Sequence, residues 1–286
     1  MSALLATNTR TIALKNIDRL PSLSPAVNRL LGMLAKRDID MNLLGRTINS
    51  DPSLCGHIMS AANSAFFNRG GQIKAIDQAV SRLGLTKLRR IALSKSVSRI
   101  FRGLRTPEAW SMTRFQLHSV ATGAAAELLC EYLPVEDSEN AFLGGLMHDV
   151  GKVLIACGQP VQYAEIEKMV QMTGRDQIEF EREILGTDHA ELSGLAVAKW
   201  ELPFPLARAV AQHHNPEAPR EFGQVSLSAI LKASDRFTNS LGISVREAPA
   251  DLEPPQLPVL AGHEYPRIDF ADQFQEEWKV LSAVCF

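Results

Sequence analysis

Apolar positions recur at spacings of three and four residues through most of the chain, which is the period of amphipathic α-helices. The pattern predicts helices over residues 24–37, 40–50 and 51–67, and two helices over 74–101 that break near Gly84. No stretch of useful length alternates with the period of a β-strand, and no internal repeat occurs. We therefore expect an all-α fold.

The chain divides into three segments where the composition changes. Pro107 interrupts the helical pattern, and we expect a break within residues 103–110 between an N-terminal basic lobe, 1–107, and a second helical lobe, 108–242. The last segment, 243–286, holds a Pro-rich loop and an amphipathic helix that we expect to pack on the core. The apolar side of this helix carries Phe270, Phe274, Trp278, Leu281 and Cys285.

Composition places the chain among ordinary soluble globular proteins. Hydrophobic residues make up 45% and charged residues 22% of its 286 positions, which is enough apolar content for a sizeable core. The four cysteines have no CxxC spacing, which argues against a zinc ribbon or a disulfide framework and fits a reducing compartment. The sequence contains neither a signal-peptide core nor an apolar run of membrane-spanning length. We expect a cytoplasmic protein without a membrane partner.

Charge is distributed unevenly between the lobes. Residues 1–107 hold 17 Lys and Arg against 5 Asp and Glu, whereas the remainder holds 13 against 27. Two explanations stay open: two lobes with complementary solvated surfaces that dock, or a basic lobe that binds an anionic partner. A nucleic acid is a third candidate partner, but it is disfavoured because the basic residues between 87 and 105 lack interleaved aromatic side chains and a known reading motif. Docking on the acidic lobe or on an acidic protein is the favoured interpretation.

One apolar run contains two adjacent ionisable residues. The stretch AFLGGLMHDVGKVLIACG, residues 141–158, places His148 beside Asp149 in the middle of a hydrophobic segment. Burying such groups without partners costs several kcal/mol, so they must pair with other residues or bind something. Lys152 follows His148 by one helical turn, where it can pair with Asp149 or neutralise a phosphate.

Five of the seven histidines lie in the second lobe, each on or at the end of an apolar helical segment. Together with two aspartates they form a candidate metal site: His118, His148, Asp149, His189, His213, His214 and Asp235. Imidazole and carboxylate are ligands for Fe, Mn, Zn and Ni, and helical folds build metal sites from inward-pointing residues of several helices. The set is large enough for one or two divalent metal ions, with Asp149 as a bridge between two.

Each of these residues also has a purely structural explanation. A single histidine on an apolar helix face is usually a hydrogen-bonded core residue, and a histidine pair at a helix end is often a cap. Asp235 can form a local ion pair with Arg236. The complete HDxGK string is harder to explain by chance, because average composition yields it on the order of once in a thousand chains of this length.

The motif GLMHDVGK resembles the signature of the HD superfamily of metal-dependent phosphohydrolases, and the order of the seven candidate ligands is similar to that in its HD-GYP branch. Residues 48–93 resemble the first half of the HDOD domain, the HD-related output domain of bacterial signalling proteins. The features that carry this resemblance are Asp51-Pro52, Asn63-Ser64, Ile73, Ala79 and Leu83-Gly84. The segment ILGTDHAELSGLAVAKWELPFPLARAVAQHHNP is also similar to HDOD, so the resemblance covers residues 18–242.

The resemblance implies an all-α fold of two helical lobes, of which the second is HD-like. It also implies a regulatory or scaffold role in which other signalling proteins are the partners. HD-GYP phosphodiesterases continue their histidine pair with a Glu and a Gly-Tyr-Pro loop, whereas this chain continues as HHNPEAPREFG. The missing loop argues against hydrolysis of cyclic di-GMP, although a nucleotide or cyclic dinucleotide stays a candidate ligand.

Two functional hypotheses remain. In the first, the protein is a regulatory binding module whose HD residues form a vestigial or structural metal-capable site. In the second, it is a metal-dependent phosphohydrolase for a phosphodiester or a nucleotide, in which the seven candidate ligands bind metal and Asp149 and Lys152 serve the reaction. The tendency of the family and the missing loop favour the first hypothesis.

Overall fold

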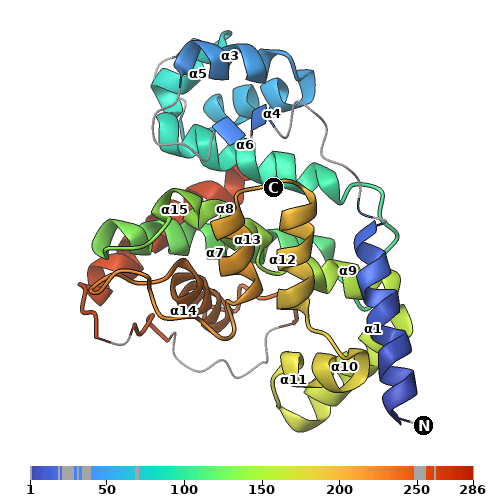
Figure 1. Cartoon of the computed structure of the whole chain (residues 1–286). Helices are drawn as coiled ribbons and strands as arrows, with labels where there is room; N and C mark the ends of the chain where they lie inside the picture. The colour runs from blue at the N-terminus through green and yellow to red at the C-terminus, as the bar shows by residue number, and fades with distance from the viewer. Residues whose placement is uncertain are drawn as a thin grey trace. The chain divides into compact units, whose positions relative to one another are not determined.

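Helices make up nearly all of the regular structure in a computed structural model of the chain (Figure 1). The structure describes residues 2–18, 20, 29–30, 32–33, 40–67, 71–247, 256–260 and 262–285, without the side chains of residues 2–8 and 41–42. Within these residues the predicted all-α fold is confirmed, and strand-like pairing is limited to two isolated bridges. Most of the helix predicted over residues 24–37 lies outside the described residues.

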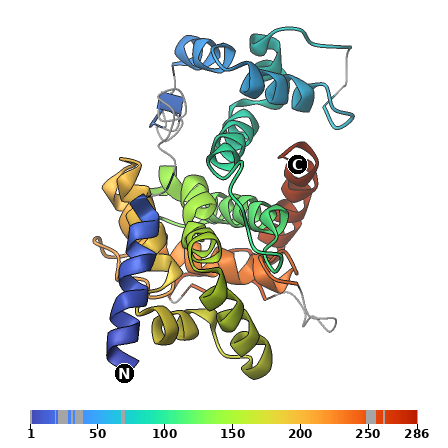
Figure 2. The ribbon, with the colours of Figure 1, turned by 90° about the vertical axis from the view of Figure 1, so that its right-hand side faces the viewer.

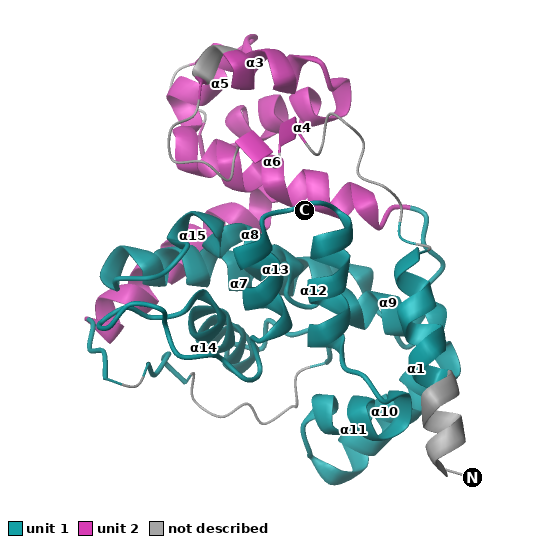
Figure 3. Cartoon of the chain, viewed as in Figure 1, with its two compact units in different colours: residues 1–21, 103–265 teal, residues 22–102, 266–286 magenta. Residues whose placement is uncertain are grey.

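The chain folds into two compact units that do not follow its order in sequence (Figure 3). Unit 1 comprises residues 1–21 and 103–265, and unit 2 comprises residues 22–102 and 266–286. The boundary at residue 103 lies within the predicted break. The N-terminal helix belongs to unit 1 and the C-terminal helix to unit 2, which differs from the division at residue 107 expected from the sequence. Composition marks where a chain is interrupted, but it does not show on which unit a terminal helix packs.

Unit 2 is built from short helices and the C-terminal helix. Its described helices are α3 (Met41–Asn49), α4 (Pro52–Ala62), α5 (Ile76–Leu83), α6 (Leu85–Ile100) and α15 (Arg267–Cys285). Asp51 begins α4, because its side chain accepts the backbone N–H of Leu54 at 3.0 Å. Gly84 separates α5 from α6 at the predicted position, with a φ of +75° that favours glycine.

The C-terminal helix α15 packs against α6 and α4 within unit 2. Its apolar side buries Phe270, Phe274, Leu281 and Cys285, and half-buries Trp278. Arg90 of α6 is almost fully buried and pairs with Glu277 of α15 at 2.5 Å. Lys95 of α6 donates a hydrogen bond to the backbone oxygen of Cys285 at 2.7 Å. These contacts make α15 a structural part of unit 2.

Unit 1 surrounds the long helix α7. Its elements are α1 (Ser2–Asp18), α7 (Met112–Tyr132), the 3₁₀ turn η1 (Ser138–Asn140), α8 (Ala141–Met147), α9 (Val150–Gly158), α10 (Pro160–Thr173), α11 (Gln177–Leu185), α12 (His189–Lys199), α13 (Phe204–Ala211) and α14 (Leu227–Ser240). Helix α7 packs against α8 and α14, and α12 packs against α9 and α13. The N-terminal helix α1 lies along α9, α11 and α12, as Figures 1 and 2 show.

Two glycines let α7 and α8 approach closely. A Cβ atom on Gly145 would lie 2.3 Å from the backbone nitrogen and Cα of Gly123, and a Cβ atom on Gly123 would lie 2.7 Å from the backbone oxygen of Phe142. Only glycine fits at such a crossing. The close approach brings His118 of α7 and His148 at the end of α8 to a ring-centroid distance of 5.2 Å.

Within the described residues one segment, Ser138–Gly158, does have the length and apolar character of a membrane span, contrary to the expectation from the sequence. It comprises η1, α8 and α9 rather than one continuous helix, and 83% of its most apolar stretch is buried inside the fold. Core segments of globular proteins share this composition, because both environments exclude water. Its apolar character is explained by its burial in unit 1.

Candidate metal centre

The seven candidate ligands meet in one site of unit 1, although they come from different helices. His118 lies on α7, His148 and Asp149 at the α8–α9 junction, His189 at the start of α12, His213 and His214 just after α13, and Asp235 on α14. The predicted proximity is confirmed: Nε2 of His148 lies 3.6 Å from Oδ1 of Asp235. Asp235 therefore faces the histidines, and the local ion pair with Arg236 considered above is not observed.

The glycine of the HDxGK string allows α9 to pack against α12. A Cβ atom on Gly151 would lie 2.1 Å from the backbone oxygen of His189. The backbone N–H of Gly151 donates to the hydroxyl of Ser193 at 2.8 Å, and that hydroxyl donates to the backbone oxygen of His189 at 2.7 Å. The start of α9, which carries Asp149, is thus held against the start of α12, which carries His189.

The ligands divide into two groups. Group A consists of His118, His148, Asp149 and Asp235, and group B of His189, His213 and His214. In each group, one donor atom from every residue lies within 4.8 Å of the others, a separation that permits a shared metal ion. All of these residues are buried except His214, which is partly exposed.

Asp149 lies between the two groups and presents one oxygen to each. Its Oδ2 lies 3.5 Å from Nε2 of His118 and 3.4 Å from Nε2 of His148 in group A. Its Oδ1 lies 3.4 Å from Nε2 of His189 and 3.9 Å from Nε2 of His213 in group B. This is the arrangement of a carboxylate that can bridge two metal ions.

Four of the histidines are oriented by a hydrogen bond at Nδ1, which leaves Nε2 facing the site. The acceptors are the backbone oxygens of Ile243, Gly145 and Val210 for His118, His148 and His213, and the carboxylate of Glu181 for His189. Each acceptor requires a hydrogen on Nδ1, so in the neutral ring Nε2 carries the lone pair. Metal-binding histidines are commonly held in this way.

Some of the donor atoms that face the site form no hydrogen bond with protein groups, although Nε2 of His189 and Nε2 of His214 form one with each other at 2.8 Å. Nε2 of His118, His148 and His213, and Oδ1 of Asp149, are buried and form no hydrogen bond with the described residues. Leaving one buried polar group unsatisfied costs about 1–3 kcal/mol, and native proteins rarely do so. Divalent cations held by the two groups would satisfy all four atoms, and imidazole and carboxylate are suitable ligands for them. The residues therefore fit a metal.

The pKa values of the histidines are shifted in opposite directions in the two groups, upward for His118 and downward for His213 and His214. Burial would lower the pKa of His118, but the carboxylates of Asp149 and Asp235 outweigh it and raise that pKa to about 9. In group B, burial and the neighbouring histidines lower the pKa of His214 to about 3 and hold the pKa of His213 well below its usual value. His213 and His214 are thus held in the neutral form in which imidazole binds metals, whereas metal binding at His118 has to displace the proton of that ring.

The site opens into a cleft of about 480 Å³. Its walls include the candidate ligands His189, His214 and Asp235 and the cations Lys152, Lys232 and Arg236. Nζ of Lys152 lies 2.6 Å from Oδ2 of Asp149, which is the pairing considered from the sequence. The Lys152 side chain is 14% exposed, so its ammonium group sits where the cleft meets the ligands. A molecule in the cleft would contact both the ligand groups and this cation.

Comparison with known sequences identifies the family. The HDOD domain profile matches residues 20–216, which is more than half of the chain. The chain belongs to the HDOD domain family. An uncharacterized protein of Treponema pallidum (strain Nichols) is 26% identical to this HDOD chain over 234 residues. That alignment covers 77% of the chain but only 43% of the Treponema protein, so the chain spans less than half the length of this relative.

Solved structures show the same HDOD fold. An HDOD domain protein of unknown function from Geobacter sulfurreducens has a TM-score of 0.74 at 20% identity, covering 97% of this chain and 98% of that one. A protein from Shewanella amazonensis SB2B, named as a candidate phosphohydrolase, has a TM-score of 0.70 at 22% identity, with 96% and 98% coverage. At these identities the similarity establishes the fold alone.

Sequence reasoning missed one residue of this HDOD site. Glu181 of α11 is completely buried, and its Oε2 accepts both Nδ1–H of His189 at 2.6 Å and the backbone N–H of His189 at 2.8 Å. Gln177 donates to the other oxygen at 2.7 Å. In the sequence QIEFEREIL, nothing distinguishes Glu181 from Glu179 and Glu183 except the helical period, which places it on the same side as Ile178 and Leu185.

Proposed function

We propose that this HDOD protein is a metal-dependent phosphohydrolase. In this proposal the residues of group A and of group B would each hold a divalent metal ion, and Asp149 presents one carboxylate oxygen to each group. One observation carries the proposal: ligands of both groups, together with Lys152, line an open cleft. A purely structural site would have no need of that opening, because structural metal sites are closed and catalytic ones keep an accessible position.

The intact donor set also argues against a vestigial site. Four buried donor atoms face the site without protein partners, and the histidines are oriented by hydrogen bonds at Nδ1. A site that no longer binds metal would keep the energetic cost of these buried groups without compensation. We therefore favour the phosphohydrolase over the regulatory module, although the sequence alone favours the regulatory module.

The chain's own residues would bind and orient an anionic substrate. Lys152, held by Asp149, lies at the point where a phosphate in the cleft would meet the ligand groups, and Lys232 and Arg236 add positive charge to the same walls. When bound, divalent metal ions polarise the phosphoryl group and activate a water molecule. Fe, Mn, Zn and Ni all suit this donor set.

The substrate class that fits is a phosphoester such as a nucleotide. We do not propose cyclic di-GMP as the substrate. In the segment after the histidine pair, Glu217 forms an ion pair with Arg208 and accepts a hydrogen bond from Gln212. Glu217 does not line the cleft. The segment therefore provides no counterpart of the Glu and Gly-Tyr-Pro loop that the HD-GYP branch carries.

A second candidate function is regulatory binding without turnover, with other signalling proteins as partners. Membership of the HDOD family favours it, as does the missing loop after His214. One solved structure of similar fold, from Marinobacter aquaeolei VT8, is named as a candidate signal transduction protein, with a TM-score of 0.72 at 18% identity. It covers 98% of this chain and 65% of that one. In this case the metal would stabilise unit 1, and a bound nucleotide would act as a signal.

The two candidates are separated by a metal-dependent assay. The protein is purified, its metal content is measured by mass spectrometry, and hydrolysis is followed with p-nitrophenyl phosphate, bis(p-nitrophenyl) phosphate, nucleotides and cyclic dinucleotides. The phosphohydrolase predicts turnover that chelation abolishes and that Mn, Fe, Zn or Ni restores. Metal-loaded protein that binds a nucleotide but turns over no member of the panel would favour the regulatory candidate.

A further inference from the structure

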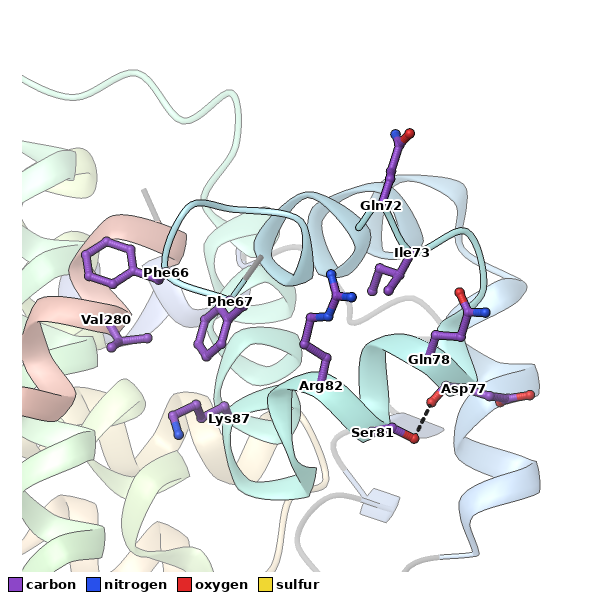
Figure 4. A pocket seen from close by; sticks show the side chains of 10 residues that line it. All are labelled: Phe66, Phe67, Gln72, Ile73, Asp77, Gln78, Ser81, Arg82, Lys87 and Val280. Carbon is purple, nitrogen blue, oxygen red and sulfur yellow. Dashed lines mark hydrogen bonds between the residues drawn. The ribbon is translucent and has the colours of Figure 1, made fainter. Parts of the chain in front are cut away.

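A groove of about 1020 Å³ lies in unit 2 (Figure 4), whereas all of the candidate metal ligands belong to unit 1. Its lining comes from the segment that follows α4, from α5, from the first turn of α6 and from α15. Neither of the functions considered above uses this groove. The family resemblance, which rests largely on sequence motifs, assigns nothing to it.

The groove has an apolar wall that includes two adjacent aromatic residues. Phe66 is 50% exposed, and Phe67 and Val280 are half-buried, while Ile73 is buried at the opposite part of the lining (Figure 4). Burying the side chain of one phenylalanine contributes roughly 1.5–3 kcal/mol, so leaving Phe66 half exposed forgoes a substantial gain. Aromatic residues held at a surface in this way are typical of protein interfaces.

Hydrogen bonds hold residues next to the aromatic wall in place. The side chain of Asn63 accepts the backbone N–H of Ile73 at 2.9 Å and donates to the backbone oxygen of Ile73 at 3.1 Å. Arg82 of α5 donates to the backbone oxygen of Gly71 at 2.9 Å. These hydrogen bonds join Asn63 to Ile73 and Gly71 to α5, and holding these described parts of the lining in place lowers the ordering entropy that a ligand has to overcome.

The charges at the groove select an acidic partner. Arg82 and Lys87 lie in its lining against a single acidic residue, Asp77, and no described ion pair neutralises either cation. Nζ of Lys87 lies 6.0 Å from the ring centroid of Phe67, which places positive charge next to the aromatic wall. The net charge of the surrounding sequence is also positive, since residues 22–102 hold 13 Lys and Arg and four Asp and Glu.

We propose that this groove binds an acidic segment of a partner protein that inserts one aromatic or leucine side chain between Phe66, Phe67 and Val280. The apolar anchor would bury the exposed wall, and flanking Asp or Glu side chains would pair with Lys87 and Arg82. A nucleic acid fits less well, because two cations, an aspartate and an aliphatic wall offer few phosphate contacts. The proposal is independent of what the metal centre does.

The test uses the full chain and fluorescein-labelled peptides of about twelve residues, a length of the order that groove-binding peptides use. One set is rich in Asp and Glu with a central Trp, Phe or Leu; matched sets replace the anchor with Ser or the acidic residues with Lys. Binding is followed by fluorescence anisotropy. We expect the acidic, anchored peptides to bind, and added salt to weaken them because the flanking charges are exposed.

Two variants and two matched controls locate the binding. Phe66→Ala removes part of the apolar wall, and K87E reverses the adjacent charge; each should weaken binding about tenfold or more. Phe222→Ala removes an exposed aromatic residue of unit 1, and K279E reverses an exposed charge of α15 outside the groove lining; neither should change binding. Circular dichroism checks that each variant folds.

Three outcomes would overturn the proposal. The first is that acidic, anchored peptides bind no better than the Ser-anchored or Lys-rich sets. The second is that binding is unchanged in both Phe66→Ala and K87E, which would put the peptide elsewhere on the chain. A single-stranded oligonucleotide that displaces the peptides and loses affinity in K87E would identify the groove as a nucleic-acid site instead.

Discussion

Glu181 accepts two hydrogen bonds from His189, one from Nδ1–H at 2.6 Å and one from the backbone N–H at 2.8 Å. The pair is buried, and His189 is the group B ligand nearest to Asp149. The carboxylate fixes the orientation of the ring and directs Nε2 into the site. Carboxylates in this position also raise the basicity of a metal-binding imidazole.

Replacing this carboxylate should weaken metal binding without removing a ligand. In Glu181→Gln the amide oxygen can still accept one hydrogen bond, but the charge that supports Nδ1–H is lost. We expect the affinity for metal to fall about 10–100-fold. Competition with a chromophoric chelator measures it. Glu179→Gln is the matched control on the same helix, because Glu179 is exposed and pairs with Arg175. Equal affinities in Glu181→Gln and wild type would contradict the role assigned to Glu181.

Among the described residues, Asp149 is the carboxylate with one oxygen toward each ligand group, so its loss should affect both. In Asp149→Asn we expect the metal content of groups A and B to fall together. Metal that binds only the folded state stabilises it by mass action, and the thermal midpoint should fall with the metal content. Mass spectrometry of the metal and thermal unfolding measure the two quantities. Full metal occupancy in Asp149→Asn would rule out the bridging position.

The glycine of the HDxGK string should be intolerant of a side chain. Alanine at position 151 would place Cβ 2.1 Å from the backbone oxygen of His189, and backbone cannot move aside cheaply. We expect Gly151→Ala to reduce the free energy of unfolding by about 3 kcal/mol and to weaken metal binding, because α9 and α12 must separate. Gly56→Ala is the control: Gly56 lies within α4 with open space around it, and alanine should stabilise that helix slightly. Similar stabilities of the two variants would show that the contact is not tight.

The sequence predicts much of the fold of unit 2, because the residues that begin and end helices there lie at the boundaries that the packed structure has. The break at Gly84 and the start of α4 at Asp51 are found where the sequence predicts them. The helix predicted over residues 51–67 instead ends at Ala62, because the side chain of Asn63 binds the backbone of Ile73. That interaction joins residues ten positions apart in the sequence, which helical periodicity does not reveal.

The sequence predicts the ligands of the candidate site but not how they are arranged, because the arrangement also depends on contacts between residues far apart in the sequence. Its ligands could be proposed individually, because histidine and aspartate are unusual in apolar helical segments. The bridging position of Asp149 and the support from Glu181 depend on how α9, α11 and α12 pack. The assignment of α1 to unit 1 depends likewise on distant contacts, such as the ion pair of Arg10 with Glu191 at 2.7 Å.

Asp51 should make the stability of unit 2 depend on pH. Burial would raise its pKa, but the hydrogen bond from Leu54 N–H and the ion pair with Arg99 outweigh it, so the folded-state pKa lies below the usual 3.8. A lowered pKa means that the ionised carboxylate stabilises the fold. This contribution is complete above about pH 4 and is lost as the pH falls through the folded-state pKa.

We therefore expect Asp51→Asn to be less stable than wild type at pH 7, by about 1 kcal/mol. The difference should shrink as the pH falls below 4, where protonated Asp51 resembles asparagine. Urea unfolding followed by circular dichroism measures it across this range. A difference between the two proteins that is constant from pH 7 to pH 3 would exclude the ionised state as its source.

The central claim is that the open, Lys152-bearing site turns over a phosphoester rather than only holding metal. In metal-loaded protein Asp149 keeps cationic partners without Lys152, so Lys152→Ala should retain metal content and thermal midpoint. Removing the charge that contacts the phosphate should lower kcat about 100-fold or more. The decisive measurement is phosphoester hydrolysis by metal-loaded wild type and Lys152→Ala, with metal content and thermal unfolding recorded on the same samples. The account predicts turnover in wild type that is lost in Lys152→Ala at unchanged metal and stability; equal turnover in both, or none in metal-loaded wild type, would contradict it.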